Sequence, residues 1–356
     1  MIRVLGLSLY GPQAASHRVR LSQFQQGLAA QGIDLQIQSL LDDDYIHRRF
    51  AGGRPSLRGL IAAYAQRLKV LSRSAPADLA IVYGELLPFL PAFLESHLLN
   101  IPYIYDYDDA FYLKYRGARF RWLQRLLGAK FDHIMTSASA VTAGNAGLAA
   151  YARRFNTNTV LLPSVVDTEH YRPADLAPSS APLTVGWIGS PSTAPYLQQL
   201  VEPLQQLACE RPVRFLVVGG PAPAISGVQV IEQPWSLEQE VPLIQQFSVG
   251  VMPLPDSEWA RGKCAYKLIQ CMACAIPVIA SPVGANVQAV PPTCGMLAGD
   301  SAEWLAALRQ LAADADLRKR MGAAGRCWVE DRYSLRSALP VLTSVIRRTA
   351  ATSVQV

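Results

Sequence analysis

Residues 252–284 read MPLPDSEWARGKCAYKLIQCMACAIPVIASPVG, and this stretch decides the fold. A short apolar run ends at Pro253, and a polar loop then carries Arg-Gly-Lys at 261–263. Apolar residues at helical spacing predict a helix over 264–274, and the apolar run 277–280 predicts the strand behind it. A strand, a loop, a helix and a second strand in this order are typical of a parallel α/β sheet.

The loop before the predicted helix has the features of a phosphate site. Free backbone N–H groups and the dipole at a helix N-terminus attract phosphate, and Gly262 lets a ligand approach the backbone. Arg261, Lys263 and Lys267 add positive charge, and we expect both lysines on nearly the same helix face. Such a site would stabilise a departing diphosphate. The alternative is a buried helix with solvated lysines at its N-terminus.

The same stretch resembles the donor-binding signature of family 4 glycosyltransferases, which has two glutamates followed by a Met-Ala-x-Gly-x-Pro-Val-like run. Residues 272–278 (MACAIPV) fit that run. The alignment places Gln270 at the second glutamate, the expected ribose partner, and Gly262 at the first. One branch of the family carries a Gly-Lys variant, with Lys at the position of Lys267. A Gln side chain still exchanges hydrogen bonds with ribose hydroxyls.

Residues 186–197 (GWIGSPSTAPYL) resemble the segment that opens the family's donor domain. The resemblance implies that Gly189 and Ser190 lie against the diphosphate. Family members often carry basic residues here, whereas this chain has Pro195 at the expected Lys. The charge would then come from the 261–267 region. Without the resemblance, Gly189-Ser190 is equally an ordinary strand-to-helix turn.

Two further donor contacts follow from the resemblance. Trp235 follows a predicted strand whose end lies near the nucleobase in the family, so it can stack on a base or pack in the core. Asp256 or Glu258 can replace the glutamate lost at Gly262.

The acidic cluster of the first half is Asp106-Tyr-Asp-Asp109, at the end of a predicted strand. Carboxylates this close repel each other, so one is expected to have a raised pKa or to pair with an Arg. A similar run in the resembling branch implies that Asp108 or Asp109 positions the reacting sugar or the acceptor, with Asp106 on the acceptor side. Alternatively, the cluster caps the next helix. A third interpretation is a divalent cation on Asp106 and Asp108, as in metal-dependent glycosyltransferases of another fold.

The loop after the first predicted strand, 11–20, is the remaining match. Gly11 is a candidate donor contact, and Ser16, His17 and Arg18 are candidate acceptor contacts at the start of a helix predicted over 18–31. Together with Arg20 they can hold an acceptor phosphate or the donor diphosphate. His17 by itself is more typical of a surface residue.

The whole chain alternates strands and helices in two blocks, which predicts two doubly wound domains. The resemblance implies the α/β fold called GT-B: two Rossmann-like domains facing a cleft, with a C-terminal helix crossing back. We expect Pro340 to break that last helix and Ser334 to cap it. The predicted division is an acceptor domain 1–166, a linker 167–182, a donor domain 183–335 and a returning helix 336–356.

Composition excludes several classes of protein. With 356 residues, 50% hydrophobic and 17% charged, the chain is globular rather than disordered. The beginning does not resemble a signal peptide, so we expect a cytoplasmic protein with reduced cysteines that act as small core residues. Cys271-x-x-Cys274 has no second pair to complete a zinc site, and no metal is predicted.

The charge is uneven: 18 Lys and Arg against 11 Asp and Glu up to residue 160, and 15 against 16 after it. A basic half suggests a phospholipid surface, a nucleic acid or a phosphorylated acceptor. The basic stretches 48–58 and 114–125 flank apolar residues, so they can lie on an anionic bilayer or form solvated helix faces. We predict peripheral contact with the cytoplasmic face of a membrane and no nucleic acid partner.

Together these observations predict a glycosyltransferase that uses a UDP-, GDP- or dTDP-linked sugar as co-substrate, without a required cofactor. The resemblance implies retention of anomeric configuration, and the acceptor is a glycan, a lipid-linked sugar or a small molecule. The alternatives are a non-catalytic partner with the same fold, the metal-dependent enzyme, and a sugar-nucleotide epimerase or hydrolase.

Overall fold

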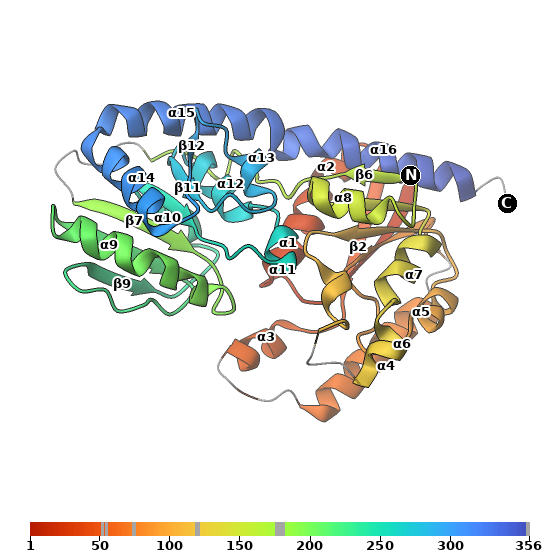
Figure 1. The fold of residues 1–356 in the computed structure, drawn as a ribbon. Coiled ribbons are helices and arrows are strands. Elements are labelled where there is room, and N and C mark those ends of the chain that lie inside the picture. Colours follow the sequence, from red (N-terminus) through yellow and green to blue (C-terminus); the bar gives the residue numbers. More distant parts are fainter. Residues whose placement is uncertain (51–52, 54–55, 73–75, 118–121, 175–181, 354–356) are drawn as a thin grey trace. The chain divides into compact units, whose positions relative to one another are not determined.

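Two parallel β-sheets organise the chain, one in each of two structural units (Figure 1). The first unit comprises Met1–Ser164 and Ala338–Val356, and the second comprises Val165–Ser337. The computed structural model describes residues 1–50, 53, 56–72, 76–117, 122–174 and 182–353.

The sheet of the first unit has, over the described residues, six parallel strands in the order β2-β1-β3-β4-β5-β6. Apolar runs form these strands, and β3, β4 and β5 are buried along their whole length. The strand order reverses beside β1, which is the point where open α/β sheets bind ligands, beyond the carboxyl ends of the strands. The strands are β1 (Ile2–Ser8), β2 (Ile33–Ser39), β3 (Leu79–Tyr83), β4 (Tyr103–Tyr107), β5 (Ala140–Ala143) and β6 (Thr159–Leu161).

Short helices connect these strands. They are α1 (Ala15–Arg20), η1 (Ser22–Phe24), α2 (Gln25–Ala29), α3 (Asp43–Phe50), α4 (Leu57–Ser72), α5 (Ala92–Leu98), η2 (Phe111–Leu113), α6 (Gln124–Leu127), α7 (Lys130–Ser137) and α8 (Ala146–Ala152).

The sheet of the second unit also has six parallel strands over the described residues, in the order β12-β11-β10-β7-β8-β9. Its order reverses between β7 and β10, so the loops after these strands flank the expected ligand position. The strands are β7 (Leu183–Ile188), β8 (Val213–Val218), β9 (Gln229–Gln233), β10 (Val249–Met252), β11 (Val278–Ala280) and β12 (Gly295–Leu297).

Helices pack on both faces of this second sheet, around two apolar clusters. They are η4 (Ala194–Leu200), α9 (Val201–Ala208), α10 (Glu240–Ile244), α11 (Glu258–Arg261), α12 (Tyr266–Ala273), α13 (Asn286–Ala289), α14 (Ser301–Ala313) and α15 (Ala315–Arg332). The last helix, α16 (Leu335–Ser353), belongs to the first unit from Ala338 onward.

The predicted fold class is confirmed: two α/β units, each with a parallel sheet. The return of the last helix is visible in its packing. A Cβ added to Gly27 on α2 would lie 2.6 Å from Leu339, so the glycine lets α16 approach closely.

Three local expectations need correction or refinement. The predicted break at Pro340 is wrong, because Pro340 lies inside α16 and the chain bends earlier, at Tyr333. Ser334 caps α16 as expected, since its Oγ accepts from the Ser337 N–H at 3.2 Å. The helix predicted over 18–31 is broken at Leu21, a buried residue with non-helical φ and ψ.

The predicted linker 167–182 begins within the second unit. Tyr171 is buried there, and residues 175–181 lie outside the described residues. The cysteines are free, as expected, but Cys209 and Cys327 are exposed rather than part of the core. Among the described helices, none combines the length and apolarity needed to cross a bilayer.

Candidate functional site

The turn after β7 brings Gly189 and Lys267 together in the second unit. A Cβ added to Gly189 would lie 2.4 Å from the Trp187 ring and 2.7 Å from Lys267 Cε, so only glycine fits. Lys267 Nζ lies 5.0 Å from the centroid of the Trp187 ring and donates to Thr193 Oγ1 at 3.1 Å. Ser190 follows on the same turn. A cation, a glycine turn and hydroxyls therefore meet at the carboxyl end of β7.

The turn after β8 packs against this first turn. Gly219 has a φ of +83°, and an added Cβ would lie 2.3 Å from the Gly189 carbonyl oxygen and 3.0 Å from Trp235 Cβ. The two turns are therefore in backbone contact, and Trp235, which is half-buried, lies next to them. The residues predicted for the diphosphate and for the base are thus neighbours.

A buried carboxylate links Trp235 to Gln270. Glu240, only 3% exposed, accepts a hydrogen bond from Trp235 Nε1 at 2.9 Å and one from the Tyr171 hydroxyl at 2.6 Å. Gln270 Nε2 donates to the Tyr171 hydroxyl at 3.0 Å and also to Glu240. Burial raises the pKa of Tyr171, so its hydroxyl stays protonated and acts as a donor.

The loop after β10 holds the other predicted cations. Arg261 makes a two-pronged ion pair with Asp256, at 2.7 and 2.9 Å, and both side chains are exposed. Lys263 Nζ lies 5.7 Å from the Trp259 ring centroid. Gly262 ends the short helix α11.

The helix that follows begins later than predicted. It starts at Tyr266, preceded by Ala265 in the left-handed region at φ 56°, and not at residue 264. Lys263 lies before this helix, so the expectation that Lys263 and Lys267 share one helix face is wrong. The short helix α11, capped by Ser257, lies where a loop was predicted.

In the first unit, Asp106 is part of a buried ion pair. Arg20 donates to its two carboxylate oxygens at 2.9 and 2.6 Å, and the Thr142 hydroxyl donates at 2.6 Å. Arg20 also donates to the Leu162 carbonyl at 2.9 Å. The expected pairing of the acidic cluster with an Arg is therefore present. The structure gives Asp106 the role of tying α1 to the sheet, and direct acceptor contact by Asp106 stays a prediction.

Asp108 lies beyond the carboxyl end of β4 and is partly exposed. Its Oδ1 accepts from the Tyr83 hydroxyl at 2.5 Å, and its Oδ2 accepts from the Ser164 hydroxyl at 3.2 Å. Burial, and then the nearby Asp108 carboxylate, raise the pKa of Tyr83 well above its usual range. Asp109 is also partly exposed and begins the turn to η2, where its carbonyl accepts from the Phe111 N–H at 2.7 Å. In the described residues, no three His, Cys, Asp or Glu side chains cluster as a metal site.

The residues predicted to contact the acceptor make hydrogen bonds within the loop after β1. His17 is 6% exposed, not a surface residue, and its Nδ1 lies 3.1 Å from Ser8 Oγ and 3.2 Å from the Tyr10 carbonyl oxygen. Burial lowers the pKa of His17. Arg18 donates to the carbonyls of residues 12 and 13, Gly11 packs against Asp43, and Ser16 is half-buried.

Residues 182–314 match the family model described as Glycosyl transferases group 1. This segment is therefore similar to a group 1 glycosyltransferase domain. It contains every donor residue predicted for the second unit, from Gly189 to Gln270, whereas Tyr171 lies outside it.

Solved structures similar to this glycosyltransferase cover almost all of it. Sucrose-phosphate synthase from Thermosynechococcus elongatus aligns with a TM-score of 0.73 at 19% identity, over 99% of this chain and 100% of that chain. HepE from Anabaena, solved with UDP and glucose, aligns with a TM-score of 0.69 at 13% identity, over 98% and 100%. A glycosyltransferase from Rickettsia africae aligns with a TM-score of 0.68 at 14% identity, over 98% of each chain. At these identities the likeness shows the fold, which is GT-B. No curated protein sequence matches the chain.

Sequence reasoning missed two residues of this glycosyltransferase. Glu240 accepts hydrogen bonds from both Trp235 and Gln270. In the sequence, its position five residues after Trp235 is the one feature that could have pointed to it. Tyr83, the last residue of β3, donates to Asp108, which lies 25 positions later in the sequence. Because β3 and β4 are neighbouring parallel strands, their ends lie close together, and this could have predicted the contact.

Proposed function

We propose that this glycosyltransferase binds a nucleoside diphosphate sugar in its second unit and transfers the sugar, with retention, to a glycan or lipid-linked acceptor held by the first. The observation that carries the proposal is the meeting of Gly189, Lys267 and Trp235 at the carboxyl ends of β7 and β8. We also propose that the chain belongs to the Gly-Lys branch of family 4.

The Lys267 ammonium group would neutralise part of the charge of the diphosphate. Its stem is confined between Gly189 and the Trp187 ring, so the ammonium group has little freedom and loses little entropy on binding. A fixed cation stabilises the departing diphosphate without reorganising. Lys263 adds a wider positive field from the neighbouring loop, in which Asp256 balances the charge of Arg261.

The base and ribose would be held through the hydrogen bonds to Glu240. Because Trp235 Nε1 is bound to Glu240, the plane of the indole is fixed, and a fixed aromatic face suits base stacking. Gln270 keeps its amide oxygen as an acceptor for a ribose hydroxyl. HepE, a structure of the same fold, was solved with UDP-glucose, which makes uridine the first base to test.

On the acceptor side, we propose that Asp108 and Asp109 position the reacting groups. The Tyr83 and Ser164 hydroxyls both donate to Asp108 and orient its carboxylate. The loop of Ser16, His17 and Arg18 would contact the acceptor. A metal on Asp106 would have to displace Arg20 from its buried two-pronged pair, which favours transfer without a metal.

A thermal-shift panel tests the donor proposal. The protein is heated with UDP, GDP, dTDP and their sugar conjugates, with and without EDTA. A ligand that binds only the folded protein raises the melting temperature. We expect one nucleotide series to stabilise the protein in EDTA. The variant Lys267→Ala should lose this shift, and Lys319→Ala, which removes an 82% exposed lysine of the same unit, should keep it.

Three outcomes count against the proposal. A shift that disappears with EDTA would favour the metal-dependent alternative. If no nucleotide produces a shift, donor binding by the second unit is refuted. Hydrolysis of the donor without an acceptor would instead favour the hydrolase alternative.

A further inference from the structure

Helix α4 of the first unit presents a row of apolar side chains to solvent. Leu57 is 73% exposed, Ile61 62% and Leu68 42%. Their spacing of four and seven residues places them on one side of the helix. Only Arg67 and Leu71 of this helix are buried, both in its second half. The first half of α4 therefore stands away from the core of its unit.

The row borders a shallow hollow with purely apolar walls, formed by Leu60, Ile61, Tyr64, Ala65 and Leu68. Further exposed apolar side chains lie on or just before α5 and around α6 of the same unit. They are Phe89, Phe93, Leu94, Trp122 and Leu126, with exposures of 51, 59, 42, 80 and 57%.

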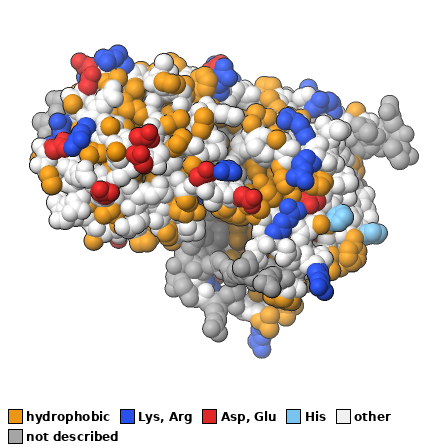
Figure 2. Space-filling model, viewed as in Figure 1, with side chains coloured by type: hydrophobic (Ala, Val, Ile, Leu, Met, Phe, Trp, Pro, Cys, Tyr) orange, Lys and Arg blue, Asp and Glu red, His pale blue; other side chains and the backbone are white. Residues whose placement is uncertain are grey.

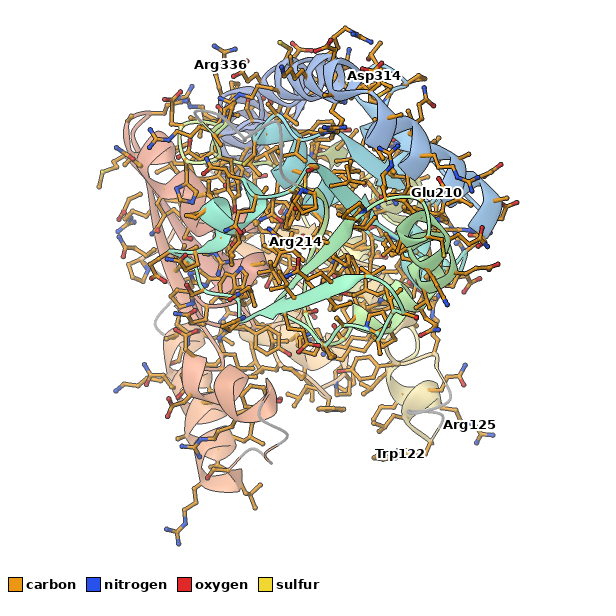
Figure 3. The ribbon with its side chains drawn as sticks, turned by 90° about the vertical axis from the view of Figure 1, so that its left-hand side faces the viewer. Trp122, Arg125, Glu210, Arg214, Asp314 and Arg336 are labelled. Carbon is orange, nitrogen blue, oxygen red and sulfur yellow. The ribbon has the colours of Figure 1, made fainter. Side chains whose placement is uncertain are left out.

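Two of these elements lie in the lower part of the first unit. In Figure 1 and, turned by 90°, in Figure 3, α4 and α6 both lie there, on opposite sides of it in Figure 3, and Trp122 and Arg125 point away from this unit. In Figure 2 this lower part shows hydrophobic and Lys or Arg side chains below the grey atoms. We call the exposed apolar residues of α4, α5 and α6 the apolar end.

The exposed charges on α4 and α6 have a single sign. Between Asp44 and Asp78 the sequence has seven Lys and Arg and no acid, and between Asp109 and Asp132 it has six and no acid, although Arg67 and Lys130 are buried. Arg58, Lys69 and Arg125 are exposed beside the apolar side chains. Parts of both stretches, residues 51–52, 54–55, 73–75 and 118–121, lie outside the described residues.

We infer that the apolar end binds the surface of an anionic lipid bilayer, with the α4 row inserted among the lipids. Exposed apolar side chains bordered by cations are what such a surface selects, since leucines and tryptophan enter the interface and lysine and arginine meet the headgroups. This inference rests on the proposed function and deepens it, because membrane binding would bring the first unit to a lipid-linked acceptor.

Other occupants fit the same surface less well. A second copy of the chain would bring the exposed cations of two α4 helices together, which costs electrostatic energy. A nucleic acid would use the cations but would leave the α4 row in water. Of these three partners, only an anionic membrane would contact both the apolar and the basic side chains favourably.

Vesicle co-sedimentation of the full chain tests the inference. The vesicles are phosphatidylcholine with or without phosphatidylglycerol, at low and high salt. We expect binding to the vesicles with phosphatidylglycerol, weakened by salt. Leu57→Asp combined with Ile61→Asp should lower partitioning about tenfold or more, and Arg58→Ser combined with Lys69→Ser several-fold. The control Leu161→Asp changes a 43% exposed residue on strand β6 of the same unit and should bind like the wild type.

Several results would overturn the inference. The wild type fails to bind anionic vesicles, the α4 variant binds as well as the wild type, or the cations alone account for binding. A dimer that the α4 variant dissociates, without vesicle binding, would make the apolar end an interface between copies. Melting temperatures check folding, and Leu57→Ser with Ile61→Ser is the milder variant. Nucleotide shifts, measured in parallel, separate a failure here from a failure of donor binding.

Discussion

The hydroxyl of Tyr83 donates a 2.5 Å hydrogen bond to Oδ1 of Asp108, from the end of one strand to the residue just beyond its neighbour. Tyr83 is buried and rests edge-on against the ring of Phe111. The phenol can therefore hardly move, and it fixes the direction of the carboxylate.

The variant Tyr83→Phe keeps the ring and removes this hydrogen bond. On the role proposed for Asp108, we expect kcat to fall about tenfold or more, because a misdirected carboxylate loses transition-state contacts, and we expect the nucleotide thermal shift to stay. Steady-state kinetics with the donor found in the panel check this. Tyr151→Phe, which removes a similar 2.6 Å bond to Asp132, is the control. An equal loss in both variants would mean that Tyr83 is merely structural.

Gln270 and Glu240 form a matched pair, and restoring the glutamate expected from the family should harm the protein. Gln270→Glu places a second carboxylate beside the buried Glu240 and removes a donor. We expect unfolding free energy to drop by about 1–3 kcal/mol at neutral pH, and the double variant Glu240→Gln/Gln270→Glu to regain much of it. Urea unfolding of the four proteins measures this coupling, and additive effects would contradict it.

The buried acid Glu95 should make stability depend on pH. Burial raises its pKa to about 7, although the Lys130 ion pair and the Leu87 N–H favour its charged form. The folded state then holds a proton that the unfolded chain releases near its ordinary pKa of 4.5. The contribution is therefore complete below about pH 4.5 and is lost as pH rises through about 7.

Comparison with Glu95→Gln isolates this contribution from other groups, including His17. We expect the wild type to lose up to about 3 kcal/mol relative to the variant between pH 5 and 8. Denaturant unfolding across that range measures it. Parallel pH profiles for the two proteins would show that Glu95 ionises normally.

Gly189→Ala tests the close packing at the β7 turn. The added methyl would overlap the Trp187 ring and displace Lys267, so we expect destabilisation of about 1–3 kcal/mol and loss of the nucleotide shift. Gly117→Ala, whose added Cβ meets nothing closer than 4.0 Å, should change neither. A Gly189→Ala protein that still responds to nucleotide would remove this turn from the donor site.

The alternation of apolar runs, glycine turns and helical periods was enough to predict two parallel sheets. The turn at Gly189 was also predictable, because a glycine directly after a buried strand is a local signal. The interruption at Leu21 and the left-handed Ala265 were not, since both depend on packing by distant residues that no local propensity reveals.

The candidate site was predictable where charge and turns lie close together in sequence, as at Lys267. The site was not predictable where a contact joins segments that are distant in the sequence. Glu240 meets Tyr171 across 69 positions, and neither residue has an unusual neighbourhood in the sequence. His17 looked like a surface residue because nothing local shows that Ser8 and the Tyr10 carbonyl enclose it.

The first unit is discontinuous, since it needs residues from Ala338 onward, whereas the second is one uninterrupted stretch. On a ribosome, which adds residues from the N-terminus, the second unit is therefore complete before the first can receive α16. Until then the face of α2 at Gly27, against which Leu339 packs, stays uncovered. Synthesis thus has an interval in which residues 1–164 depend on a helix that is made only after the second unit, and chaperones can bind the first unit during that interval.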